Sequence, residues 1–195
     1  MTVLNLRAGQ DHLEKVASTR DPIKALAEFV WNAVDAEATR VSVEYVLNAL
    51  GGIEEIKIRD NGTGISRAQA ERDFGHLGDS WKRASHRTPT LHRALHGKEG
   101  RGRLRFFSLA QQAGWRSVYM EDGEYRAISI DIASGALEKS DLSEPSNLTS
   151  ANTGTVVTLS RLKAAHDWLL TQQAFAEFNT LFAPYVQQYP DVVIS

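Results

Sequence analysis

The stretch Glu28-Phe29-Val30-Trp31-Asn32-Ala33-Val34-Asp35-Ala36 predicts a helix that carries a functional site. On an α-helix, which turns about 100° per residue, its three polar side chains, Glu28, Asn32 and Asp35, lie within about 60° of one another. The rest of the helix surface is apolar, which is typical of a buried helix. Because a buried carboxylate without a partner is costly, we expect this stripe to face a metal ion, a polarised water and a ligand.

Composition places the chain among globular proteins. Its 195 residues are 42% hydrophobic, which is enough to form one domain with a full core. The formal net charge of −2 gives no bulk indication of nucleic-acid binding, and the absence of cysteine excludes disulfides and thiolate metal sites. No apolar run approaches the roughly 18 residues of a membrane helix, and residues 1–5 lack the features of a signal peptide. We therefore expect a soluble, cytoplasmic protein that does not enter the membrane.

Hydrophobic periodicity predicts an α+β fold. Asp21-Pro22 is a good helix start, with Asp as the cap and Pro at the first helical position. From there the predicted elements are a helix to about Ala38, strands at 41–47 and 53–60, and a long polar loop with short helical pieces at 65–96. A helix at 103–113, strands at about 115–121 and 125–132, a loop at 133–152, a strand at 155–159 and an amphipathic helix from Lys163 to about Gln188 follow. Adjacent hairpins combined with helices imply a mixed, largely antiparallel sheet with helices on one face.

Asp60 ends the second predicted strand and precedes Asn61-Gly62-Thr63-Gly64. Because side chains alternate along a strand, Asp60 falls on the same inward face as Ile56 and Ile58. An inward carboxylate followed by glycines suggests an acceptor for an exocyclic amino group, on a ligand that approaches the backbone closely. The alternative is an Asp that caps the following turn. Taken with the stripe on the helix, the pattern favours the ligand site.

A third candidate element is the glycine-rich sequence Gly97-Lys98-Glu99-Gly100-Arg101-Gly102-Arg103, which leads into the helix predicted at 103–113. Such loops expose backbone N–H groups to phosphate oxygens, and Lys98, Arg101 and Arg103 add positive charge. The sequence matches neither the Rossmann fingerprint nor the Walker loop, since no parallel strand precedes it and no Gly-Lys-Ser/Thr follows. Taken alone, the sequence is more typical of a flexible basic hinge.

The order of these motifs resembles the GHKL superfamily, whose members are DNA gyrase-type topoisomerases, heat-shock chaperones, sensor histidine kinases and MutL, with the MORC ATPases as relatives. The resemblance rests on Glu-x-x-x-Asn-x-x-Asp-Ala, Asp-x-Gly-x-Gly, Gly-x-x-Gly-x-Gly and Gly154-Thr155, and it spans residues 28–159. It implies the Bergerat ATP-binding fold, a two-layer α/β sandwich that holds ATP between helices and sheet under a mobile lid. In this chain the lid would lie at about 65–96, within a single ATP-binding domain of residues 1–195.

The resemblance also implies roles for individual residues. Glu28 would be the general base for the attacking water, Asn32 would ligate Mg²⁺, and Asp35 would support the site near the nucleotide. Asp60 would accept a hydrogen bond from the adenine amino group, with Thr155 assisting it. The other residues expected at the nucleotide are Gly62, Gly64 and Ile65 beside the base and sugar, Lys82 in the lid, and Gly97, Lys98, Gly100, Arg101 and Gly102 around the phosphates.

Glu28 favours hydrolysis over phosphoryl transfer to a histidine. Sensor histidine kinases usually carry Asn in place of Glu28 and Lys in place of Asp35, and a general base contributes roughly 10²–10⁴-fold in rate. The expected function is therefore Mg²⁺-dependent ATP binding and slow hydrolysis, which drive a conformational or dimerisation cycle of a chaperone-like or DNA-transaction protein. A non-hydrolysing ATP switch or DNA-interaction module is the alternative, and a histidine kinase is the third. The motifs leave the subfamily open.

The basic stretch from Lys82 to Arg105 holds eight Lys or Arg against one Glu, and three interpretations stay open. It could form a nucleic-acid patch, a lid that neutralises a triphosphate, or a solvated loop. His92 and His96 have the spacing of metal ligands on a helix, but no acidic third ligand is obvious, so a structural or lid role is favoured. Residues 189–195 predict a strand that begins just as the sequence stops. We therefore expect the N-terminal module of a longer protein, with homodimerisation on ATP binding and a C-terminal transducer domain or partner protein.

Overall fold

The computed structural model describes residues 10–18, 21–75, 86–96 and 102–195. Five residues of the predicted site, Lys82, Gly97, Lys98, Gly100 and Arg101, lie outside these described residues. Within the described ranges, no helix is long and apolar enough to cross a membrane.

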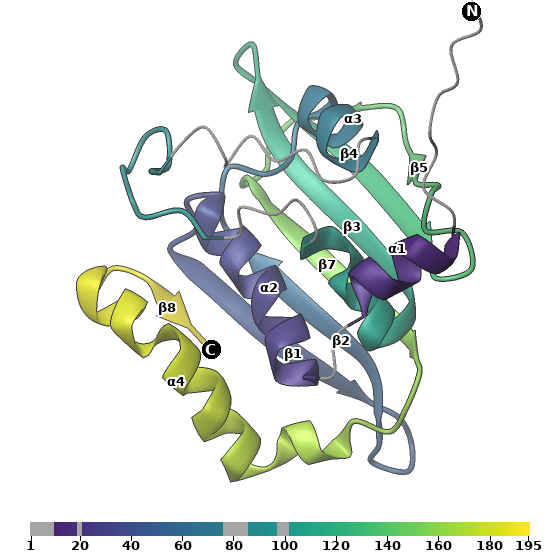
Figure 1. Ribbon diagram of the computed structural model, residues 1–195. Helices are drawn as coiled ribbons and strands as arrows, with labels where there is room; N and C mark the ends of the chain where they lie inside the picture. Colours follow the sequence, from purple (N-terminus) through teal and green to yellow (C-terminus); the bar gives the residue numbers. More distant parts are fainter. Residues whose placement is uncertain (1–9, 19–20, 76–85, 97–101) are drawn as a thin grey trace, which may run out of the picture.

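An eight-stranded mixed sheet forms one layer of the molecule (Figure 1). Its strands follow the order β5-β4-β3-β7-β2-β1-β8, with β6 paired to β4. The pairs are antiparallel, except for the short parallel pair of β1 and β8. The strands are β1 (Arg40–Leu47), β2 (Ile53–Asp60), β3 (Ala110–Glu121), β4 (Glu124–Ala133), β5 (Asp141–Leu142), β6 (Ser146–Leu148), β7 (Gly154–Leu162) and β8 (Val193–Ile194).

Helices cover one face of this sheet, which confirms the predicted two-layer α+β architecture. Figure 1 shows α1, α2 and the 3₁₀ helix η2 in front of the sheet, with α4 near the edge formed by β8. The start of α2 follows the sequence prediction, because the Asp21 side chain accepts a hydrogen bond from the Lys24 N–H at 3.1 Å. The helices are α1 (Gln10–Ala17), α2 (Pro22–Asp35), α3 (Arg67–Gly75), η2 (Gly102–Ser108), η3 (Asp167–Leu170) and α4 (Gln172–Gln188).

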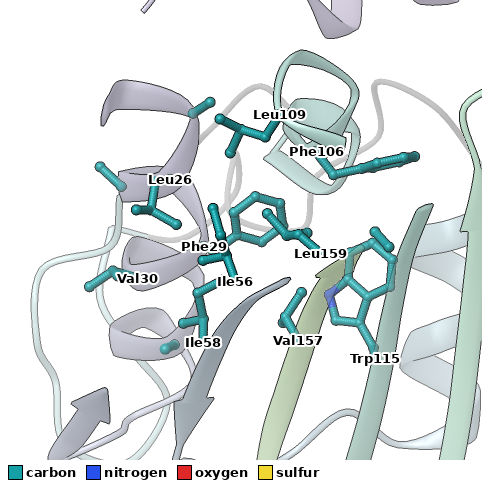
Figure 2. Close-up of a cluster of buried hydrophobic side chains, with 14 of the residues drawn as sticks. Leu26, Phe29, Val30, Ile56, Ile58, Phe106, Leu109, Trp115, Val157 and Leu159 are labelled. Carbon is teal, nitrogen blue, oxygen red and sulfur yellow. The ribbon is translucent and has the colours of Figure 1, made fainter. Parts of the chain in front are cut away.

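Apolar side chains from both layers meet in one core between the helices and the sheet (Figure 2). The strands contribute alternate residues, as expected for a sheet with one covered face. The labelled members are Ile56, Ile58, Val157, Leu159 and Trp115 from the sheet, and Leu26, Phe29, Val30, Phe106 and Leu109 from the helical layer. This alternation fixes the inward face of each strand, and it places Asp60 on that face as predicted.

Two predicted helices differ from the structure. The helix expected at 103–113 is the short η2, and β3 already begins at Ala110 because it pairs with β7 from that residue onward. Sheet pairing outweighs the local preference there. The last helix begins at Gln172 rather than near Lys163, because the Thr171 hydroxyl caps it by accepting the Ala174 N–H at 3.2 Å.

Two predicted loops contain regular structure. The stretch 133–152 includes the short strands β5 and β6, and β7 is longer at both ends than the strand expected at 155–159. The stretch 65–96 is predicted as a long loop with short helical pieces, and α3 is such a helix within it. The stretch also includes residues 86–96, here named the docked turn, which fold back through a β-bridge between Arg87 and Ala94.

Candidate functional site

The three polar side chains on the α2 stripe, Glu28, Asn32 and Asp35, differ in their exposure to solvent. Asp35 is buried, Glu28 is half-buried and Asn32 is exposed. The burial expected for this helix therefore does not extend to Asn32. Within the described part of the chain, the Glu28 side chain makes no hydrogen bond or ion pair with another residue. A half-buried carboxylate of this kind has the chemistry of a proton acceptor.

Asp60 lies at the end of β2, where two backbone N–H groups bind one of its oxygens. The N–H of Gly62 donates to Oδ1 at 2.8 Å and the N–H of Thr155 donates to the same atom at 3.2 Å. Burial raises the pKa of the Asp60 carboxyl from an ordinary 3.8 to about 6, although the two hydrogen bonds oppose this shift. In the described residues, Oδ2 accepts no hydrogen bond. It is the oxygen available to a donor on a ligand.

Asp60 is one end of a polar row that crosses three neighbouring strands. Thr155 on β7 lies beside it, since Arg59 pairs with Val156, and Ser117 on β3 pairs directly with Thr155. The Ser117 and Thr155 hydroxyl oxygens are 2.9 Å apart, and both residues are buried. One inward position further along each strand, the side chains are Ile58, Val157 and Trp115 of the apolar core. The inward face of the sheet therefore changes from apolar to polar at this end.

Ser117 was absent from the sequence prediction. It also accepts a hydrogen bond from the Ile65 N–H at 2.7 Å, and so it joins the loop after β2 to the polar row. Its signal in the sequence is the alternation of Trp115, Ser117 and Tyr119, a small polar residue between two buried aromatic residues. The predicted strand at 115–121 contained this alternation, but the serine was not linked to Asp60 or Thr155.

The glycines of the site allow strands and loops to approach each other closely. A Cβ atom on Gly64, which has φ of +76°, would lie 2.1 Å from the Val118 carbonyl oxygen. A Cβ atom on Gly154, with φ of +147°, would lie 2.1 Å from the Asp60 carbonyl oxygen. Any other residue at these positions would force the backbone apart. In the structure these glycines allow protein backbone to approach, and the position of Gly64 beside a ligand stays a prediction.

Asp35 contacts the segment that precedes the glycine-rich sequence. Its Oδ1 accepts a hydrogen bond from the His96 N–H at 2.9 Å and lies 3.6 Å from Nδ1 of the same histidine. The His96 ring also stacks on Trp31 of α2, with ring centroids 3.8 Å apart. The α2 helix thus carries Glu28 and Asn32 and also fixes the residue directly before Gly97.

The docked turn is tied to the end of α2 by two further groups. Glu37, which has φ of +64°, accepts hydrogen bonds from the N–H groups of Thr90 at 2.7 Å and Leu91 at 2.6 Å. Burial alone would raise the pKa of Glu37, but hydrogen bonds led by that of Leu91 lower it below its ordinary value. Arg93 is buried, donates to the Ala38 carbonyl oxygen at 2.8 Å and forms an ion pair with Asp191.

These contacts change the interpretation of the basic stretch. Arg93 is committed to the fold, so one of its eight cations is not available to a phosphate or a nucleic acid. Among the described residues, no group of three His, Cys, Asp or Glu side chains is placed to hold a metal ion, so His92 and His96 have no partners for a site of that type there. His96 instead contacts α2, through its backbone N–H and its ring.

A separate hollow of about 400 Å³ lies on the opposite face of the sheet. Gly114, Arg116, Asp131 and Thr158 are among its lining residues, and none of the predicted site residues is. Its central charged groups, Arg116 and Asp131, neutralise each other in an exposed ion pair. This hollow is therefore separate from the inward face of the sheet, where Asp60 lies.

Comparison with known proteins agrees with this geometry. Residues 20–161 match the family described as histidine kinase-, DNA gyrase B- and HSP90-like ATPases. The DNA mismatch repair protein MutL of Lactobacillus acidophilus is 42% identical over 53 residues, which are 27% of this chain and 8% of that protein. MutL of Lactobacillus helveticus is 40% identical over 53 residues, with the same coverage. The match thus spans only a small part of these relatives. Because the family match covers most of the chain, and the polar row and the α2 stripe lie within it, the chain belongs to the histidine kinase-, DNA gyrase B- and HSP90-like ATPases, the GHKL superfamily that its motifs resemble.

Proposed function

We propose that this domain binds ATP together with Mg²⁺ and hydrolyses the ATP slowly, with Glu28 as the general base. The observation that carries the proposal is the Asp60 carboxylate. It lies half-buried on the inward face of the sheet, two N–H groups hold one of its oxygens, and the other oxygen has no partner among the described residues. A desolvated carboxylate in this state is a functional-site candidate on physical grounds.

Asp60 defines the end of the site that would take the base. Oδ2 would accept a hydrogen bond from the adenine amino group, and Thr155, next to it on β7, would assist. Gly62, Gly64 and Ile65 would border the base and sugar, because they form the loop that leaves β2 at this point. An acceptor oxygen favours an amino group over a carbonyl oxygen, so adenine should be preferred to guanine.

The α2 helix would supply the end of the site that takes the phosphates. Mg²⁺ prefers oxygen ligands and usually keeps several waters beside one or two protein groups and substrate phosphates. The exposed amide of Asn32 fits such a donor set, and Glu28 lies one turn earlier on the same stripe, where it would take the proton from the attacking water. Gly97, Lys98, Gly100, Arg101 and Gly102 would surround the phosphates, and Lys82 would reach them from the lid.

ATP binding would then drive a conformational or dimerisation cycle in a longer protein. The two similar proteins named above act in DNA mismatch repair, and this favours a DNA-transaction protein over a chaperone-like one. Asp35 would connect the cycle to the docked turn, because it binds the His96 N–H directly before the glycine-rich sequence.

Substitution of Glu28 tests the proposal. We expect Glu28→Ala to lower steady-state phosphate release by about 10²-fold or more, while ATP–Mg²⁺ still raises the melting temperature. Glu177→Ala, an exposed residue on α4, is the matched control and should keep the parent rate. Melting curves with ATP, ADP and GTP should show the adenine nucleotides as the stronger ligands. Release at the parent rate by Glu28→Ala would remove Glu28 from the reaction, and a parent rate of zero with intact ATP binding would favour a non-hydrolysing switch.

A further inference from the structure

The hydroxyl groups of Ser117 and Thr155 form a buried pair beside Asp60. Ser117 is 1% exposed and Thr155 is 6% exposed, so neither hydroxyl can exchange its partners freely with bulk water. The Ser117 oxygen accepts the Ile65 N–H at 2.7 Å, lies 2.9 Å from the Thr155 oxygen and lies 3.4 Å from the Gly154 carbonyl oxygen. These contacts limit where the two hydroxyl hydrogens can point.

A serine hydroxyl has one hydrogen to donate and can accept two hydrogen bonds. If Ser117 donates its hydrogen to the Gly154 carbonyl oxygen, it can accept one bond from the Ile65 N–H and a second from the Thr155 hydroxyl. This arrangement uses every hydrogen-bonding position of Ser117. The opposite arrangement, in which Ser117 donates to Thr155, leaves the hydrogen of Thr155 without a partner in the described residues. The first arrangement is therefore favoured.

We propose that Ser117 sets the base specificity of the nucleotide site by making the Thr155 hydroxyl a hydrogen-bond acceptor. Once Thr155 donates to Ser117, its oxygen presents only lone pairs to a ligand. Thr155 and Asp60 Oδ2 then form two neighbouring acceptors on the inward face. An exocyclic amino group has two hydrogens for such a pair, whereas guanine carries a carbonyl oxygen at the corresponding position.

This inference rests on the proposed function, since it concerns the base of the nucleotide bound there. Ser117 would act as a positioning residue, through Thr155 rather than by contact with the base. Its loss frees the Thr155 hydrogen, which can then turn towards a carbonyl oxygen on the ligand. A purely structural role would weaken the binding of all nucleotides equally. A role in specificity changes the ratio between two nucleotides, and this ratio is the quantity to measure.

The test compares the dissociation constants of ATP and GTP, each with Mg²⁺, for the parent chain and Ser117→Ala. We expect the ratio of the GTP constant to the ATP constant to fall about fivefold to tenfold in Ser117→Ala, the effect of one neutral hydrogen bond. Ser117→Cys, which fills the same space with a poor acceptor, should show the same fall if the alanine variant does not fold. Ser160→Ala, a serine on the opposite face of β7, is the matched control and should keep the parent ratio.

A double substitution shows whether Ser117 acts through Thr155. Thr155→Val removes the acceptor, so adding Ser117→Ala to it should not change the ratio further. An unchanged ratio in Ser117→Ala and Ser117→Cys, with folded proteins, overturns the inference and leaves the proposed function in place. A parent chain that binds neither nucleotide overturns the proposed function itself.

Discussion

Replacement of Asp60 by asparagine should stabilise the ligand-free protein while it weakens ATP binding. The carboxylate is held by the N–H groups of Gly62 and Thr155 on Oδ1, and an asparagine oxygen can accept the same two hydrogen bonds. The substitution removes the negative charge and keeps the shape. Because burial disfavours the charged form, the parent protein is less stable at neutral pH than it would be with a neutral side chain at this position.

The magnitude follows from the pKa of Asp60. A rise from 3.8 to about 6 is about two pKa units, and each unit corresponds to about 1.4 kcal/mol. The upper limit is therefore about 3 kcal/mol. The new amide N–H₂ group also needs partners where Oδ2 stood, so we expect a net gain of about 1–2 kcal/mol. In a chain of 195 residues this corresponds to a rise in melting temperature of roughly 2–8 °C.

The pH dependence of the stability difference shows whether the buried charge of Asp60 causes it. A raised carboxyl pKa means that the folded state binds the proton more tightly than the unfolded state, so the penalty is full above about pH 6 and vanishes below about pH 4. The stability difference between Asp60→Asn and the parent should be large at pH 8 and shrink as the pH falls through this window. Urea unfolding at pH 4.5, 6 and 8 measures it. A difference that does not change with pH, or a variant less stable than the parent at pH 8, would refute the reasoning.

Two further substitutions test the packing around the site. Gly154→Ala should lower the free energy of unfolding by at least about 2 kcal/mol, because its Cβ would meet the Asp60 carbonyl oxygen at 2.1 Å, whereas Gly135→Ala has nothing within 4 Å and should be near neutral in urea unfolding. Arg93→Met should cost about 1–3 kcal/mol, because it removes a buried donor to the Ala38 carbonyl oxygen. Asp191→Asn should lower the free energy of unfolding by less than about 1 kcal/mol, because that carboxylate is 59% exposed. Equal costs for these two variants would show that Arg93 does not stabilise the fold mainly through the Ala38 carbonyl oxygen.

Local periodicity was sufficient to predict the layers of the fold and the inward position of Asp60. The alternation of Ile56, Ile58 and Asp60 depends only on neighbouring residues in one strand, and the structure retains it. The boundary at Ala110 could not be predicted in this way, because it depends on pairing with β7, which lies some 50 residues later in the chain. Ser117 was missed for a related reason. Its meaning comes from its partner Thr155 on another strand, and not from its own neighbours in the sequence.

The count of eight cations in the basic stretch included Arg93, which is buried, because a count of residues carries no information about burial. The guanidinium group joins the Ala38 carbonyl and Asp191, and these partners are 55 and 98 residues away in the sequence. The same limit applies to the α2 stripe, where helical spacing predicted that Glu28, Asn32 and Asp35 share one face but carried no information about the burial of each. In the structure Asp35 is buried, Glu28 is half-buried and Asn32 is exposed.

Asp35, at the buried end of that stripe, uses an oxygen to hold the His96 N–H, so its carboxylate already serves the fold. Glu28 and Asn32 reach the surface of the same helix, where a water and a metal ion can approach them. A single helix thus fixes the segment before the glycine-rich sequence and presents the candidate catalytic groups. His96 is held by α2 at two points, its backbone N–H on Asp35 and its ring stacked on Trp31, so substitution of either α2 residue removes one of the two contacts.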